Sequence, residues 1–267
     1  AAGIPMLLLS NNAHVAAQGS WLMGYLPEQQ LDLLLTHAIV EGRTRFAIIA
    51  EDTAFGKRLA THTQRRLSQL GMPTQDTMVL RAQALASEDL LKRAIRGFAR
   101  YVEPVDDTSP TNRQAVFDTL IFAGGAEFAL RTAPVLAYYD LGSDTVMYLG
   151  NEQWNKTRIL SEPSLQGGLF AFRPSDTDSQ FVAKWGTVWQ DRPGLLARLS
   201  FDAFALAGML ADTDRADWKK ELLSNAGFNG FSGPFRLLPD GVNVRAFELR
   251  QINQGASRLI QPAPDRI

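Results

Sequence analysis

Residues 45–71 read RFAIIAEDTAFGKRLATHTQRRLSQLG, and the fold class follows from this stretch. Its first part, Arg45–Ala50, is a short apolar run that predicts a buried β-strand. The polar residues Glu51–Thr53 then offer caps for a helix, and apolar residues recur at helical spacing from Leu59 to Leu70. Gly71 is suited to end that helix. The stretch is therefore predicted to be one strand followed by one helix.

The same order of elements recurs further along the chain. Apolar runs predict four more strands, at Asp76–Leu80, Asp118–Phe122, Thr145–Leu149 and Gly168–Phe172. Helical patterns follow the first two of these strands, one capped by Ser87 and one led by Gly124-Gly125. Strands that alternate with helices at this spacing form a mostly parallel sheet with right-handed crossovers. We therefore expect an α/β fold in which helices cover both faces of such a sheet.

The pattern changes after the last of these strands. Two long helices are expected with no strand between them, at about Asp178–Gln190 and Leu195–Ala211, and a shorter helix follows at Ala216–Ser224. The chain then reads as strands from Phe231 to Ile252 around a turn at Pro239-Asp240-Gly241.

Two further segments complete the predicted order. Ahead of residue 45, Ile4–Leu9 predicts a short strand and Glu28–Glu41 a helix. The polar stretch Glu103–Arg113 contains two prolines and two aspartates. We expect it to be an exposed insertion, because the alternation of strand and helix resumes directly after it.

Composition narrows the classes of function. The chain has 267 residues, 45% hydrophobic and 21% charged, with a net charge of -1, which is typical of a soluble globular protein. Neither a basic tract nor a basic net charge points to nucleic acid. The chain contains no cysteine, which excludes disulfides, thiolate metal sites and cysteine nucleophiles.

The sequence lacks the patterns that are typical of enzyme active sites. The GxSxG, HExxH, P-loop and GxGxxG patterns are all absent, and only three histidines occur. The nearest nucleophile pattern, Gly230–Gly233, has Pro234 where the last glycine is needed. We therefore expect a non-enzymatic protein without a catalytic residue, a metal or a cofactor.

The pair Gly124-Gly125 has two interpretations. Glycines between a strand and a helix are suited to hold an anion at the helix N-terminus. A tight turn from strand to helix requires the same residues, and the sequence leaves both interpretations open.

Six segments, taken together and in order, resemble the leucine/isoleucine/valine-binding type of periplasmic binding protein, within the type I periplasmic solute-binding family. They are Gly3–Asn12, Arg45–Gly56, Asp118–Gly125, Leu149–Glu152 with Leu165–Gly168, Phe201–Ala203 and Gly233–Gly241. No single segment is specific, but six in this order cover almost the whole chain. Phe55 stands where that family usually has tyrosine.

The resemblance implies two lobes that the chain crosses more than once. Residues 1–25 and 174–244 would form the first lobe, and residues 26–173 and 245–267 the second. Family members have several more strand–helix units ahead of the strand at residues 4–9. The first lobe is therefore expected to be incomplete at its N-terminus, with too little sheet beneath its helices, including the one that carries Phe204 and Leu206.

The resemblance also implies where a ligand would bind, in a cleft between the lobes. The implied contacts are Asn12, Ala13, His14, Phe55, Gly125, Ala126, Glu152 and Trp154. Backbone N–H groups hold a carboxylate, an acidic side chain holds an ammonium and an aromatic ring covers an apolar part. An amino acid or a related zwitterion fits this chemistry. Phe55 and Trp154 alternatively pack in the core, and Glu152 alternatively lies in a solvated loop.

Two functions of different classes remain open. The first is a periplasmic receptor that binds a small solute and passes it to the permease of an ABC importer. The second is a lipoprotein of the same fold, lipid-anchored, that activates a penicillin-binding protein, a cell-wall synthase, through protein contacts. If the first lobe is incomplete, a longer chain, a second chain or a swapped dimer is expected to complete it.

Overall fold

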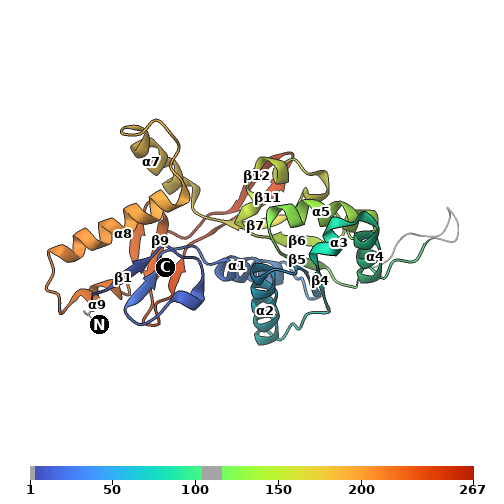
Figure 1. Cartoon of the computed structure of the whole chain (residues 1–267), viewed down its shortest axis with the longest axis horizontal. Helices are drawn as coiled ribbons and strands as arrows, with labels where there is room; N and C mark the ends of the chain where they lie inside the picture. The colour runs from blue at the N-terminus through green and yellow to red at the C-terminus, as the bar shows by residue number, and fades with distance from the viewer. Residues whose placement is uncertain (1–3, 104–115) are drawn as a thin grey trace. The chain divides into compact units, whose positions relative to one another are not determined.

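The computed structural model describes residues 4–103 and 116–267 (Figure 1). Most of the predicted polar insertion lies outside these residues, and so does Gly3. The chain divides into two compact units. Unit 1 consists of Ala1–Gln29, Phe172–Glu248 and Gln261–Ile267, and unit 2 of Gln30–Ala171 and Leu249–Ile260.

The boundaries of the units differ in detail from those predicted. Residues 26–29, 172–173, 245–248 and 261–267 belong to unit 1, although the sequence assigned them to the second lobe. The difference at residues 245–248 has a physical cause. Arg245 is buried beside Ser232, and Glu248 accepts hydrogen bonds from Ser175, so this segment is held by side chains of unit 1.

Unit 2 is built on a seven-stranded sheet with the order β12-β11-β7-β6-β5-β3-β4. The strands are β3 Phe46–Glu51, β4 Asp76–Leu80, β5 Thr119–Ala123, β6 Met147–Gly150, β7 Leu169–Phe172, β11 Glu248–Asn253 and β12 Ala256–Gln261. The pairs from β4 through β7 are all parallel. Every residue of β5 is buried, as expected for a parallel strand covered on both faces. The predicted α/β fold with a mostly parallel sheet is confirmed.

The helices that flank this sheet are α1 Pro27–Val40, α2 Ala54–Gln69, α3 Ala82–Ala86, α4 Glu88–Phe98, α5 Ala126–Tyr138 and α6 Thr157–Leu160. Four of them (α1, α2, α4 and α5) lie at predicted places, while the short α3 and α6 were not predicted. Thr53 caps α2 by accepting a hydrogen bond from the Gly56 N–H at 3.1 Å, and Ser87 caps α4 by accepting one from Leu90. Two predicted N-caps therefore do set helix starts.

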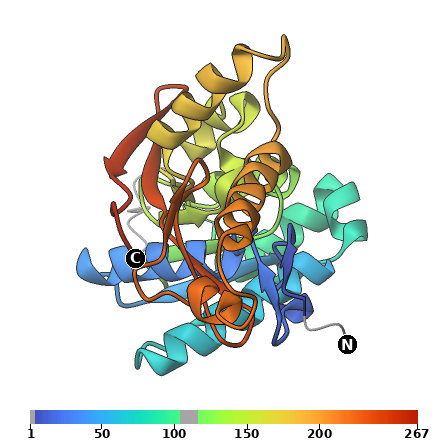
Figure 2. The same ribbon diagram turned by 90° about the vertical axis from the view of Figure 1, so that its left-hand side faces the viewer.

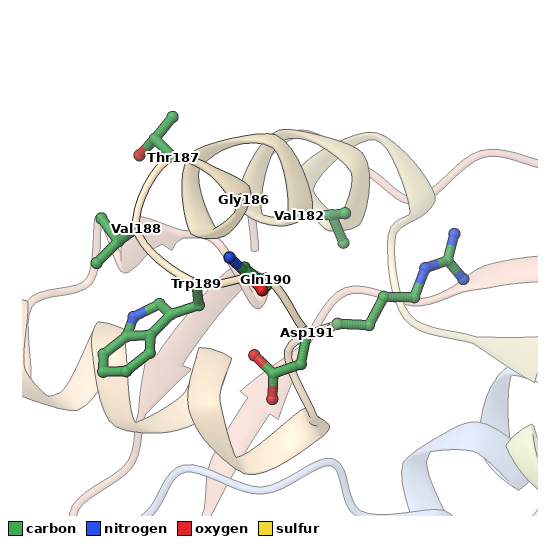
Figure 3. Close-up of a pocket in the computed structure, with 8 residues that line it drawn as sticks. Val182, Gly186, Thr187, Val188, Trp189, Gln190 and Asp191 are labelled. Carbon is green, nitrogen blue, oxygen red and sulfur yellow. The ribbon is translucent and has the colours of Figure 1, made fainter.

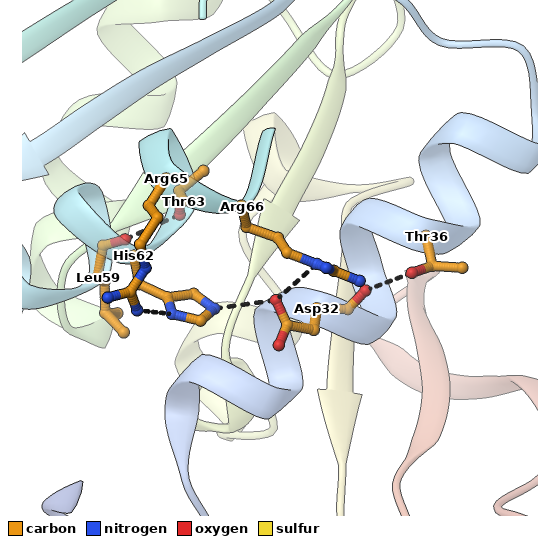
Figure 4. A network of polar contacts seen from close by, with 7 residues as sticks. All are labelled: Asp32, Thr36, Leu59, His62, Thr63, Arg65 and Arg66. Carbon is orange, nitrogen blue, oxygen red and sulfur yellow. Dashed lines mark hydrogen bonds and ion pairs between the residues drawn. The ribbon is translucent and has the colours of Figure 1, made fainter. Parts of the chain in front are cut away.

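A polar network joins α1 to α2 (Figure 4). Nε2 of His62 lies 2.9 Å from a carboxylate oxygen of Asp32, and the Arg66 guanidinium lies 3.5 Å from the same oxygen. Arg65 donates to Nδ1 of His62 at 3.2 Å. A neutral ring with its proton on Nε2 satisfies both bonds of the imidazole. His62 therefore ties the two helices together.

The C-terminal strands of unit 2 form a hairpin. Gln254 and Gly255 connect β11 to β12, and both have positive φ, as a tight two-residue hairpin turn requires. Backbone hydrogen bonds of Ile252 with Gly167 and Gly168 hold this hairpin on the sheet. The sequence prediction ended its strands at Ile252 and missed β12.

Unit 1 contains two small sheets. Its strands are β1 Met6–Leu8 and β2 Ser20–Leu22, which are parallel, and β8 Phe228–Gly230, β9 Gly233–Leu237 and β10 Asn243–Arg245, which are antiparallel. The strand at residues 4–9 was predicted from the sequence, but β2, which pairs with β1 and gives that strand a neighbour, was missed. The predicted turn at residues 239–241 joins β9 to β10.

Helices α7 Ser175–Gly186, α8 Leu195–Ala211 and α9 Trp218–Leu222 complete unit 1 (Figure 2). One side of α8 packs into an apolar core formed with the strands; its buried residues are Trp21, Met23, Leu206, Leu210, Leu222, Phe235 and Leu237. Gly186 ends α7 earlier than predicted, so Val188 lies beyond the helix.

Candidate functional site

The carboxyl ends of β3, β5 and β6 lie side by side at one edge of the unit 2 sheet. Parallel open sheets bind ligands at this edge, because loops and helix N-termini gather there. Five predicted contacts follow these strand ends directly; they are Phe55, Gly125, Ala126, Glu152 and Trp154. The edge is therefore the candidate site of unit 2.

The N-terminus of α5 forms the centre of this edge. The N–H of Gly125 points to a carboxylate oxygen of Glu51 at 3.4 Å, and the N–H of Ala126 to Oε1 of Gln153 at 3.3 Å. A carboxylate and an amide oxygen are thus the partners of a helix N-terminus, as its dipole favours. A side chain at Gly124 would lie 2.5 Å from the Phe128 ring, so the turn also needs its glycine. The structure thus shows the tight turn, and that these N–H groups hold an anion of a ligand stays a prediction.

Glu152 lies on a short helical turn, Glu152–Trp154, after β6. Its backbone N–H donates to Oε1 of Gln30 at 3.2 Å, and Nε2 of Gln30 donates to its carboxylate at 3.3 Å. Gln30 itself is buried on α1. The Asn151 amide donates to the Gly124 carbonyl at 2.9 Å and links this turn to the α5 turn. Glu152 is therefore held by two bonds and is not a loosely solvated loop carboxylate.

Phe55 lies half-buried in the first turn of α2. The next residue, Gly56, lets that turn approach the sheet: a side chain there would lie 2.2 Å from the Glu51 carbonyl oxygen and 2.7 Å from that of Ala123. The Arg58 guanidinium lies 5.8 Å from the centre of the Phe55 ring. Close packing of Gly56 therefore fixes where Phe55 stands.

Trp154 is a core residue of unit 2. Its side chain is 0% exposed and lies edge-to-face with Phe122, at 5.3 Å between ring centres. A side chain at Gly150 would collide with its indole, at 2.2 Å. Of the two interpretations given to Trp154, the structure shows packing.

The remaining predicted contacts, Asn12, Ala13 and His14, lie on unit 1 in the turn after β1. The Asn12 side chain accepts a hydrogen bond from the His14 N–H at 3.1 Å, and the Asn12 N–H donates to Oγ of Ser10. This turn follows the carboxyl end of a parallel strand, and His14 is exposed. That these three residues meet the same ligand as the unit 2 edge stays a prediction.

Sequence reasoning missed three residues of the edge: Glu51, Gln153 and Gln30. The first two stand at or just after a strand end, which is a usable signal. Gln30 carried no signal, because it lies on a helix 122 residues ahead of Glu152.

A hollow of about 570 Å³ lies elsewhere, at the connection from α7 to α8 (Figure 3). Val182 and the consecutive residues 186–192 line it, and none of them is a predicted contact. Asp191 accepts a hydrogen bond from the Trp185 indole at 3.3 Å, so its carboxylate is already engaged.

Among residues 4–103 and 116–267, no group of three or more acidic or histidine side chains is placed to hold a metal ion. None of the helices described has the length and apolar character needed to cross a membrane.

No protein-family model matches the sequence, and a search of curated proteins finds no significant match. Solved structures do match. A putative branched-chain amino acid ABC transporter protein from Rhodospirillum rubrum aligns over 97% of this chain and 73% of its own, with a TM-score of 0.74 and 16% identity. The leucine-binding protein LivK from Thermotoga maritima aligns over 98% and 74%, with a TM-score of 0.68 and 14% identity.

This is the fold of the type I periplasmic binding proteins. A third structure of this fold is an ABC transporter solute-binding protein from R. palustris, in complex with benzoate. It aligns over 98% of this chain and 72% of its own, with a TM-score of 0.63 and 17% identity. The type I periplasmic binding fold thus carries receptors for amino acids and for an aromatic acid, and the fold predicted from the sequence resemblance is confirmed.

Proposed function

We propose that this protein is a non-enzymatic extracytoplasmic receptor that binds a small solute for an ABC importer. The neighbours of the same fold are solute-binding proteins of ABC transporters, which supports the receptor class. The permease of such an importer is the partner that this function implies.

The observation that carries the proposal is the acidic edge of unit 2. Glu51 and Glu152 both lie half-buried there, around the N-terminus of α5, with Phe55 on the adjoining helix. Carboxylates in a partly desolvated site favour a cationic group such as an ammonium. An aromatic ring beside them covers an apolar side chain. The solute we propose is therefore an amino acid or a related zwitterion and not a simple aromatic acid.

Isothermal titration calorimetry with a panel of amino acids and benzoate tests this proposal. We expect saturable heat with at least one amino acid and none with benzoate, which has no ammonium to pair with Glu152. Glu152→Gln removes the charge and retains the side-chain shape, and is expected to weaken binding about tenfold or more. Glu41→Gln, at an exposed acid just after the C-terminal end of α1 in the same unit, is the matched control and should bind as the parent does.

Two results would contradict the proposal. One is a benzoate signal of equal strength that is insensitive to Glu152→Gln. The other is the absence of heat with every solute, together with capture of a penicillin-binding protein. That second outcome would favour the alternative function, activation of a penicillin-binding protein, which no observation in this structure supports.

A further inference from the structure

Gln30 is a polar side chain buried in the first turn of α1. It is 1% exposed, although glutamine is a residue that mostly lies at protein surfaces. Burying an amide is costly unless its donor and acceptor groups are hydrogen-bonded. Both hydrogen bonds described for the Gln30 amide are made with one residue, Glu152, which is a predicted ligand contact.

The two bonds join different parts of Glu152. Oε1 of Gln30 accepts from the Glu152 backbone N–H at 3.2 Å, and Nε2 of Gln30 donates to Oε2 of the Glu152 carboxylate at 3.3 Å. One planar amide therefore binds both the backbone and the carboxylate of the same residue. A glutamate side chain that is tied at its far end has few rotamers left, so its carboxylate is held in one place.

A carboxylate that is already ordered binds a cation better than a mobile one. Ordering a glutamate side chain during binding costs conformational entropy, and a preorganised site avoids this cost. A carboxylate has about four positions at which it accepts hydrogen bonds. The bond from Gln30 therefore does not prevent Glu152 from accepting a bond from an ammonium as well.

The preceding residue, Gln29, provides a comparison. It lies in the same helical turn, and its amide accepts from the Arg245 N–H at 3.2 Å and donates to the Asn243 carbonyl. Both of these partners are backbone groups of β10 in unit 1. Two adjacent glutamines thus make two amide hydrogen bonds each, and those of Gln30 are the ones that reach the candidate site.

We propose that Gln30 is a positioning residue for solute binding, which acts by holding the Glu152 carboxylate in place for the ammonium of the solute. This role rests on the receptor function proposed above, and it does not require Gln30 to touch the solute. Loss of the Gln30 amide should therefore weaken binding only as far as the Glu152 carboxylate contributes to it.

A double-mutant cycle on affinity tests this role, with the amino acid of the calorimetric panel that binds the parent most tightly as the probe. Gln30→Met removes the amide and retains the length of the side chain. We expect it to weaken binding about fivefold in the parent, and less than about twofold in a Glu152→Gln background, where the charge is already absent. Gln29→Met is the matched control. It also loses two amide hydrogen bonds in the same helical turn, and any fold-loss should be equal in both backgrounds.

Thermal melts establish that each variant is folded at the temperature of the titration. If Gln30→Met does not fold, Gln30→Asn replaces it in the cycle, because its amide is one carbon too short to reach both groups of Glu152. A parent that binds an amino acid, with equal fold-losses for the Gln30 variant in both backgrounds, would overturn the positioning role and leave the proposed function standing. A parent that binds no solute of the panel would overturn both.

Discussion

At the scale of single residues, Asp202 is a buried side chain of unit 1 on which we expect its stability to depend. It is buried on α8 and accepts hydrogen bonds from the backbone N–H groups of Phe231 and Ser232, at 2.9 and 2.7 Å, and from the Ser232 hydroxyl. Arg245 donates to the same hydroxyl at 2.9 Å. This network joins α8 to the turn between β8 and β9, and its bonds to Ser232 are buried.

Asp202→Asn should lower the free energy of unfolding by about 3 kcal/mol, because it replaces one acceptor oxygen by a donor group that faces N–H donors. Chemical denaturation measures this loss. Asp240→Asn is the control, since Asp240 is exposed in the β9–β10 turn and asparagine retains its acceptor for the Val242 N–H. Equal stability of the two variants would show that the network does not stabilise unit 1.

Tyr25 gives a prediction that depends on pH. Its hydroxyl donates to the Ser232 carbonyl at 2.7 Å, and burial raises its pKa from 10.0 to about 12. The folded protein therefore keeps the phenol proton at a pH where the unfolded chain releases it. This contribution to stability is complete below pH 10 and is lost as the pH rises towards about 12.

Tyr25→Phe should lower the free energy of unfolding by about 1 kcal/mol at neutral pH, through loss of the hydrogen bond. Between pH 10 and about 12, stability should fall less steeply in the variant than in the parent. Tyr148 also has a pKa raised by burial, and it is present in both proteins, so the comparison isolates Tyr25. Denaturation curves across this range provide the measurement, and identical slopes would refute the assignment.

At the scale of elements, the decisive contact is that between the first turn of α2 and the ends of β3 and β5. The missing side chain of Gly56 allows this contact, and the Thr53 cap sets where the turn begins. The position of Phe55 at the candidate site follows from both. Any change in the packing of this turn would therefore move Phe55 at the candidate site.

Gly56→Ala should cost about 2–3 kcal/mol, because the added carbon would lie within 2.2 Å of a backbone oxygen and α2 must move away. Gly97→Ala is the matched control on α4, where an added carbon meets no atom within 4 Å. It should leave stability unchanged or raise it by about 0.5–1 kcal/mol, since alanine favours helix. Thermal melts of the two variants compare them directly, and equal melting temperatures would refute the contact.

At the scale of the whole molecule, the sequence predicts that residues of both units bind one ligand. A double-mutant cycle on solute affinity, with His14→Ala and Phe55→Ala, tests this without reference to any arrangement of the units. Contacts to one shared ligand should give a coupling energy above about 0.5 kcal/mol. Additive losses would mean that the two residues act independently, and no effect of His14→Ala would remove the unit 1 turn from the site.

The sequence by itself determined the local elements and their order. Apolar runs and caps predicted β3, α2, β4 and α8 within a few residues, because spacing and capping are properties of neighbouring residues. Which residues distant in sequence pair or form hydrogen bonds with one another was decided only by the tertiary structure. The pairing of β1 with β2, the bonds from Gln30 to Glu152 and the position of Glu51 at the α5 N-terminus depend on how the chain crosses the sheet. No local pattern encodes that choice, because it is set by which surfaces bury one another when the whole chain folds.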